Sequence, residues 1–160
     1  MELKVRKASF TDLYRIEEIY ANARAFMAAN GNPTQWGTSY PETEMLHCDI
    51  SQGKLYVITK DSWICGVFYF GMDDDPTYHV IDGSWHSEAT YGVIHRIAGE
   101  GSGILATAVA YGSSIVSYLR IDTHADNHIM QRAIAKQGFS YCGIIHVEDG
   151  TPRFAYDRIS

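Results

Sequence analysis

A glycine-rich loop at residues 99–103 joins a strand-like segment to a helix-like segment, and this junction constrains the fold more than any other feature of the chain. Residues 91–98 are apolar in runs, as in a buried strand, whereas residues 104–109 carry apolar side chains at helical spacing. The glycines lack a Cβ, so backbone N–H groups can approach an anion at the start of the helix. The sequence therefore predicts an α/β arrangement with a phosphate-binding loop, and a plain strand-to-helix turn is the alternative.

The loop excludes one class of nucleotide-binding protein. A nucleoside triphosphatase loop ends in Gly-Lys-Ser/Thr, and neither Gly101 nor Gly103 is followed by lysine. A dinucleotide or methyl-donor fold fits better, because a second strand ends in Asp122 about 20 residues after the glycines. That fold needs several further strand–helix units, and only residues 123–160 remain. The order of elements therefore argues against it.

A third pattern fits the last third of the chain. Arg96, Gly99 and Gly101 match Arg/Gln-x-x-Gly-x-Gly/Ala, and Asn127 opens a helix that leads to a Gly-Phe step at residues 138–139. These features resemble the GNAT superfamily of acyl-CoA-dependent N-acyltransferases. The resemblance covers most of the chain, since residues 31–36, 82–85, 94–98 and 121–124 are similar to one GNAT subfamily.

The resemblance implies the GNAT fold, an α/β (α+β) domain spanning residues 1–160. We expect a mixed sheet of six or seven strands with helices on both faces. Residues 91–98 would form the central strand. The other expected strands are residues 3–8, 55–59, 64–70, 118–123 and one after Phe139, and the expected helices are residues 11–30, 41–52, one after Gly103 and one after Asn127.

The resemblance also implies acetyl-CoA as cosubstrate. Its binding residues would be Arg96, Ile97, Ala98, Gly99, Gly101, Ser102, Gly103, Ile104 and Asn127. The backbone N–H groups of residues 97–99 would bind the acetyl carbonyl. Two registers of the loop stay open, Arg96/Gly99/Gly101 and Ala98/Gly101/Gly103. The second applies if the strand runs through Ala98, and it leaves Arg96 without a role in the loop.

Two histidines are the candidate catalytic residues. An amine that attacks a thioester must lose a proton, and an imidazole titrates near neutral pH. His95 lies on the central strand and His124 ends the next one. A structural histidine, a bridging water, Glu100 or Asp122 are the alternatives for each. GNAT proteins often place a tyrosine before the Gly-Phe step to protonate the leaving thiolate, but this chain has Ile134 there. A catalytically silent acyl-CoA sensor is therefore a second hypothesis.

The acceptor is expected to be the amine of a small molecule or a peptide-like molecule. Aromatic residues in or beside the loops that surround the acceptor in GNAT folds are Trp36, Tyr69, Trp85 and Tyr91. Core packing is the alternative for all four. The net charge of −6 argues against nucleic acid and leans towards a cationic or neutral acceptor.

The sequence predicts no metal. The three cysteines, Cys48, Cys65 and Cys142, lack Cys-x-x-Cys spacing, and His124 and His128 lack the His-Glu-x-x-His order. The acidic run at residues 73–75 is expected to be an exposed loop. No apolar run reaches the roughly 18 residues of a membrane span, so we expect a cytoplasmic protein that does not bind membranes. Nothing in the sequence excludes a homodimer.

Overall fold

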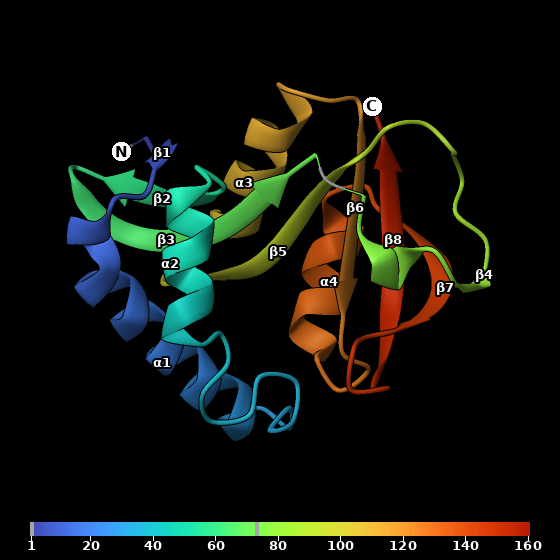
Figure 1. Ribbon diagram of the computed structural model, residues 1–160, viewed down its shortest axis with the longest axis horizontal. Helices are drawn as coiled ribbons and strands as arrows, with labels where there is room; N and C mark the ends of the chain where they lie inside the picture. The colour runs from blue at the N-terminus through green and yellow to red at the C-terminus, as the bar shows by residue number, and fades with distance from the viewer. Residues whose placement is uncertain (1, 73) are drawn as a thin grey trace.

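The computed structural model describes residues 2–72 and 74–160, and at its centre is an eight-stranded sheet (Figure 1). The strand order is β1-β2-β3-β5-β6-β8-β7-β4. The strands are β1 (Lys4–Lys7), β2 (Leu55–Lys60), β3 (Trp63–Gly71), β4 (Asp82–Gly83), β5 (Gly92–Gly99), β6 (Tyr118–Thr123), β7 (Ser140–His146) and β8 (Pro152–Ile159). The helices are α1 (Leu13–Ala29), α2 (Thr43–Ser51), α3 (Ile104–Ser113) and α4 (His128–Lys136), with short 3-10 turns at Phe10–Asp12 and Pro76–Tyr78.

Two central strands separate soon after they meet. Every neighbouring pair in the sheet is antiparallel except β5 and β6, which are parallel. That pair is joined only at Gly92–Leu119 and Val93–Arg120, and the two ribbons diverge towards their C-terminal ends (Figure 1). On the sides that face each other, the diverging halves of β5 and β6 therefore have no paired strand. A ligand can bind between them.

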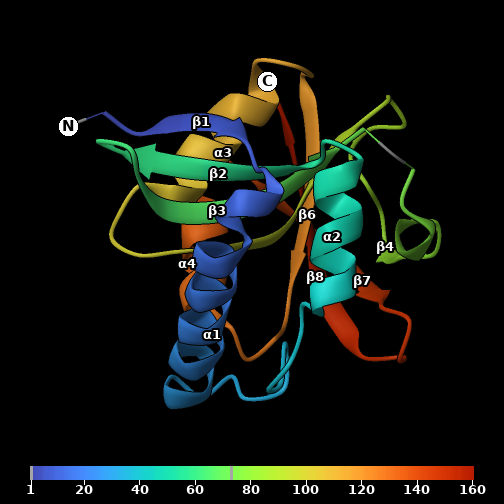
Figure 2. The same ribbon diagram turned by 60° about the vertical axis from the view of Figure 1, so that its left-hand side comes forward.

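Helices cover both faces of the sheet, as the sequence predicts (Figure 2). On one face, α1 and α2 bury residues such as Ile16, Tyr20 and Leu46 against β2 and β3. On the other face, α3 and α4 bury Ala108 and Ile134 against the central strands. Burial of this apolar surface on both sides holds the diverging halves of the sheet in place.

The sheet has eight strands rather than the expected six or seven. Of the two strands that the sequence analysis did not locate, β8 follows the turn after β7, and β4 has only two residues, which pair with Ile144 and Gly143 at the edge of the sheet. A strand of two residues carries no alternating pattern, so periodicity could not predict it. The mixed sheet also excludes the doubly wound parallel fold of the dinucleotide hypothesis.

Candidate active site

A cavity of about 590 Å³ lies where β5 and β6 diverge. Both strands contribute to its wall, and the α1–α2 loop, the start of α4 and the β7–β8 turn complete it. The lining residues used below are Gln35, Trp36, Asp75, His95, Arg96, Ile97, Asp122, Thr123, Asn127, Glu148, Asp149 and Arg153. Residues far apart in the sequence thus line one open cleft at the centre of the sheet.

Strand β5 bulges where it borders the cavity. Tyr69 pairs with His95 and Val67 pairs with Ala98, so two residues of β5 lie opposite Phe68. Arg96 has a φ of 52°, a conformation uncommon for a residue with a side chain. The Tyr20 hydroxyl donates a hydrogen bond to the Arg96 carbonyl oxygen at 2.7 Å. Contacts from α1 therefore stabilise a backbone shape that a regular strand would not adopt.

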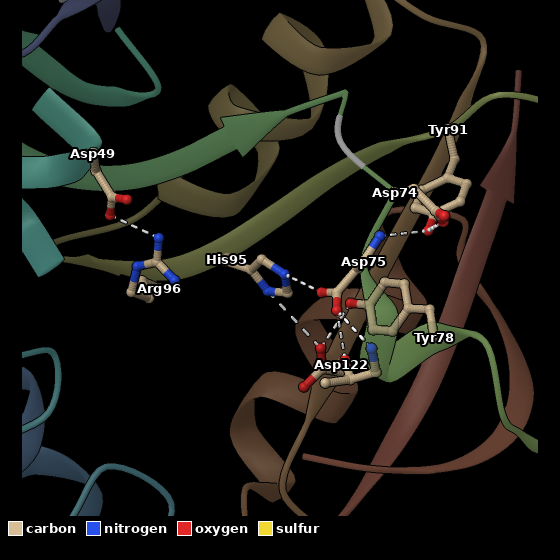
Figure 3. Close-up of polar contacts among 9 residues, drawn as sticks. Asp49, Asp74, Asp75, Tyr78, Tyr91, His95, Arg96 and Asp122 are labelled. Atoms are coloured by element: carbon tan, nitrogen blue, oxygen red, sulfur yellow. Dashed lines mark hydrogen bonds and ion pairs between the residues drawn. The ribbon is translucent and has the colours of Figure 1, made fainter. Parts of the chain in front are cut away.

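Arg96 is held away from the glycine loop. Its Nη2 donates to Asp49 Oδ2 of α2 at 2.6 Å (Figure 3). Its guanidinium stacks on the Tyr69 ring, 4.6 Å from the ring centre. Asp49 is buried, so the ion pair is shielded from solvent. The Arg96 side chain therefore fixes α2 and β5 relative to each other.

His95 points the other way and belongs to a hydrogen-bonded chain (Figure 3). Its Nε2 lies 2.8 Å from Asp75 Oδ2, and its Nδ1 lies 3.9 Å from Asp122 Oδ2. The Tyr78 hydroxyl donates to the same Asp122 oxygen at 2.7 Å. Burial alone would raise the pKa of Asp75, but the hydrogen bond and charge of His95, with bonds from Thr77, lower it to about 2. Asp75 is thus a carboxylate at neutral pH and orients the imidazole.

The glycine loop follows directly at the end of β5. The strand runs through Ala98 to Gly99, which is the condition for the Ala98/Gly101/Gly103 register. Gly101 and Gly103 have φ values of 82° and 83°, and a Cβ added at Gly101 would meet no atom within 4 Å. Gly103 caps α3, whose first N–H groups have no partner within the helix. The loop, including Ser102 and Ile104, therefore presents open backbone at a helix N-terminus.

Asn127 caps α4 and also contacts the α1–α2 loop. Its Oδ1 accepts from the Met130 backbone N–H at 3.1 Å, and its Nδ2 donates to Gln35 Oε1 at 3.1 Å. Further along the helix, Ile134 is fully buried in the core. The position at which GNAT proteins often have tyrosine is therefore a packing position here.

His124 differs from His95 in its surroundings. Its Nδ1 accepts from the Asp126 backbone N–H at 3.0 Å, and its Nε2 lies 3.4 Å from Thr34 Oγ1. Burial and then the charge of Arg153 lower the pKa of His124, although Asp126 opposes them. Both ring nitrogens have partners, so a neutral His124 has no free lone pair for an incoming proton.

The four aromatic candidates divide into two pairs. Trp36 lines the cavity, and Tyr69 lies behind it against Arg96 and His95. Trp85 and Tyr91 pack instead on the buried guanidinium of Arg120, each with its ring centre 4.1 Å away. Tyr91 also accepts from the Asp75 backbone N–H at 2.9 Å, so it supports the loop that carries Asp75.

Sequence reasoning missed two residues of the site. The acidic run is not simply an exposed loop, because Asp75 turns inward to His95; Asp73 lies outside the described residues. The signal was present, since Asp75 precedes Pro76 and its side chain accepts from the Thr77 N–H, as at a helix N-cap. Arg153 gave no such signal, because its place in the cavity depends on the pairing of β8 with β6.

One group in the described residues has the composition of a metal site. Atoms of His86, Cys142 and Asp157 lie within 4.8 Å of one another, away from the cavity. Burial and a hydrogen bond to Asp157 raise the pKa of Cys142 to about 12, so its thiol stays protonated. The buried Asp157 also accepts from the Tyr118 hydroxyl, which in turn accepts from the buried Arg120. The group is thus part of a hydrogen-bonded network around a buried cation.

Solved structures with the same fold carry acetyltransferase names. A GNAT-family acetyltransferase from Streptococcus agalactiae is 27% identical with a TM-score of 0.89, and the match covers 99% of this chain and 95% of that one. A GNAT-family acetyltransferase from Listeria monocytogenes is 18% identical over 100% and 96%, with a TM-score of 0.72. The Salmonella typhimurium protein yncA, solved with its cofactor acetyl-CoA, is 14% identical over 98% and 93%, with a TM-score of 0.62. No protein-family model and no curated protein matches the chain.

The diverging central strands, the glycine loop at the start of α3 and these similarities define an acyltransferase. The chain has the fold of the GNAT superfamily of acetyltransferases, which it shares with all three of these structures. In the part of the chain that the structure describes, no helix is long and apolar enough to cross a membrane.

Proposed function

We propose that the chain transfers the acetyl group of acetyl-CoA to an amine of a small-molecule or peptide-like acceptor, by direct attack while both substrates are bound. The observation that carries this proposal is the cavity between β5 and β6, where the His95–Asp75 pair faces the space beside the bulge of β5. The open glycine loop continues from the same strand and can bind the phosphates of CoA.

The reaction needs two contributions from the protein, hydrogen-bond donors to the carbonyl oxygen and a base for the amine proton. The amine nitrogen forms a bond to the acetyl carbon, the carbon–sulfur bond breaks, and the electron pair leaves on sulfur. Backbone N–H groups of Ile97, Ala98 and Gly99 are the proposed donors to the carbonyl oxygen, because this half of β5 has no strand paired to it on the side of β6. The amine proton goes to a base, and the thiolate takes up a proton from water. No serine or cysteine nucleophile is needed.

His95 is the better of the two candidate bases. When Nε2–H donates to Asp75, the Nδ1 lone pair is available to the amine, since the nearest Asp122 oxygen is 3.9 Å away. The imidazolium that forms then lies between two carboxylates, which stabilise its charge. His124 would first have to give up its bond to the Asp126 N–H. Asn127, Gln35 and Trp36 would position the substrates around the reacting atoms.

A binding panel followed by a turnover panel tests the proposal. We expect acetyl-CoA, and neither NAD nor S-adenosylmethionine, to raise the unfolding temperature of the protein. Amines incubated with acetyl-CoA should then release free CoA thiol. Stabilisation by acetyl-CoA without turnover of any amine would favour the silent sensor, and stabilisation by NAD or S-adenosylmethionine alone would contradict the proposal.

A further inference from the structure

A buried arginine in the cavity wall forms no salt bridge with any described residue, although Asp149 is near enough to feel its charge. Arg153 is only 9% exposed, and among the described residues its Nη1 has no hydrogen-bond partner. Its Nη2 donates to the Gln35 carbonyl oxygen at 3.3 Å, a long bond to a neutral group. No ion pair with a described carboxylate involves it, whereas Arg96 in the β5 wall is paired with Asp49. Burying a charge without a partner is costly, so this site requires another explanation.

The sheet places Arg153 on the same face as the proposed base. Asp122 of β6 pairs with Ala155 of β8, and Arg153 is two residues from Ala155, so both side chains leave the sheet on one side. His95 reaches that side as well, since its ring lies beside Asp122. Strand geometry puts the Cα atoms of Asp122 and Arg153 roughly 8 Å apart. A small molecule can therefore reach His95 and Arg153 at once.

The two ends of this face have opposite charge. Asp75 and Asp122 flank His95 and favour an ammonium group, which must lose its proton there before attack. Arg153 lies at the other end, where it offers two unused N–H groups of Nη1. This polarity matches a molecule with an amino group at one end and an anion at the other.

We propose that the acceptor is an amine that carries a carboxylate, as in an amino acid, and that Arg153 binds the carboxylate. This inference rests on the proposed acetyl transfer and names its substrate class. The carboxylate is unchanged in the reaction; only the amine nitrogen is acetylated. Nη1 is covered in the ligand-free chain, so the guanidinium turns towards the cavity when the carboxylate binds. A singly charged carboxylate suits the site better than a dianionic phosphate, because Glu148 and Asp149 also border the cavity.

Matched acceptors measure the contribution of the carboxylate. We would compare glycine with glycinamide, and L-phenylalanine with L-phenylalaninamide and phenethylamine, by CoA release. The amide has a less basic amine that is more often neutral, so intrinsic reactivity favours the amide. A charge-assisted hydrogen bond predicts that kcat/KM is nevertheless roughly 10- to 100-fold higher for the acid, mainly through KM.

Variants at Arg153 assign that preference to one side chain. Arg153→Gln should remove the preference by lowering kcat/KM for the acids far more than for the amides, and Arg153→Lys should restore part of it. The control is Arg132→Gln, at an exposed position on α4, which should keep the full preference. As a measurement without turnover, N-acetylglycine should stabilise the wild type against heat more than N-acetylglycinamide does, and Arg153→Gln should abolish that difference.

The outcomes separate this inference from the proposed function. Acetylation of amines and amides as fast as acids, with no effect of Arg153→Gln on the ratio, overturns the carboxylate site and leaves acetyl transfer intact. Release of CoA with none of the amines overturns both. A preference for acids that survives in a folded Arg153→Gln variant also contradicts the assignment to this arginine.

Discussion

The two walls of the cavity differ in whether their buried polar side chains have partners within the chain. On the β5 wall, Arg96 forms an ion pair with Asp49 and His95 with Asp75, and only Arg96 Nε is buried there without a hydrogen-bond partner among the described residues. On the wall formed by β6 and β8, Arg153 Nη1 and Thr123 Oγ1 are buried and have no partner among the described residues. Polar groups that are satisfied within the chain hold a geometry, whereas unsatisfied ones beside a cavity are free to bind a ligand.

The comparison predicts that the two histidines differ in their effect on catalysis. His95→Ala should lower turnover by roughly 10²–10⁴-fold at pH 7 with little change in acetyl-CoA affinity, because it removes the proposed base of the β5 wall. His124→Ala is the matched variant on the β6 wall and should remain within a few-fold of wild type. Steady-state kinetics over a range of pH would show this. If both variants keep the wild-type pH profile, solvent or a carboxylate deprotonates the amine.

Neither wall is expected to bind the phosphates of the cosubstrate, which belong to the loop beyond β5. Gly101→Asp should weaken acetyl-CoA binding by at least about 100-fold, because a carboxylate would be placed where phosphate lies. Gly31→Asp is a fair control, since both glycines have a φ near 80° and open space around an added Cβ. Calorimetric titration of acetyl-CoA into the two folded variants would measure this difference in affinity. Equal affinities would remove the phosphate-binding role of the loop.

We expect the Arg96–Asp49 pair and Arg153 to differ in their contribution to the free energy of unfolding. Asp49→Asn leaves Arg96 buried without its counter-ion, and we expect a loss of about 3 kcal/mol in the free energy of unfolding. Arg153→Gln removes a charge that has no partner to leave behind, so its loss should stay below about 1 kcal/mol. Urea denaturation of both variants measures the difference. Similar losses would mean that Arg153 is as much a structural residue as Arg96.

The smallest expected effect is the pH dependence of the His95–Asp75 pair. The pKa of Asp75 is lowered to about 2 in the folded chain, so its contribution is fully present above the unfolded value of 3.8 and is lost as the pH falls towards 2. We expect about 2 kcal/mol of stability to disappear over that range. Asp75→Asn should flatten the plot of the free energy of unfolding against pH, whereas Asp126→Asn, at an exposed position, should not. If the pH dependence of unfolding is the same in Asp75→Asn as in the wild type, the His95–Asp75 pair does not contribute this stability.

The helices, strands and turns that depend on residues close together in the sequence could be predicted. The strand at residues 118–123 is observed as predicted, and Asn127 caps the helix that it was expected to open. The glycine loop was located, and its register followed once the structure showed that β5 runs through Ala98. These features depend on periodicity and on residues that favour caps and turns, which a single sequence contains.

The parts that could not be predicted depend on pairing between distant segments. The bulge at Arg96 arises where β5 lies against Phe68 of β3, and nothing in residues 91–98 marks it. Arg153 enters the cavity only because β8 lies between β6 and β7 in the sheet. Trp85 was expected near the acceptor, but it stacks on Arg120, a residue whose burial the sequence does not reveal.

Gln35 has a consequence for the order of events in a catalytic cycle. Its side-chain oxygen accepts from Asn32 and Asn127, and its backbone oxygen accepts from Arg153, so one residue fastens the α1–α2 loop to the far wall of the cavity. The bond from Asn32 lies within the loop, so a ligand that draws Arg153 towards itself weakens one of the two bonds, from Asn127 and Arg153, that attach the loop to the far wall. Acceptor binding then loosens the loop above the cavity, and the departure of the acetylated product restores the attachment. With the proposed role of Arg153, its contact with Gln35 opposes binding of the acceptor and of the acetylated product alike, since both carry the carboxylate.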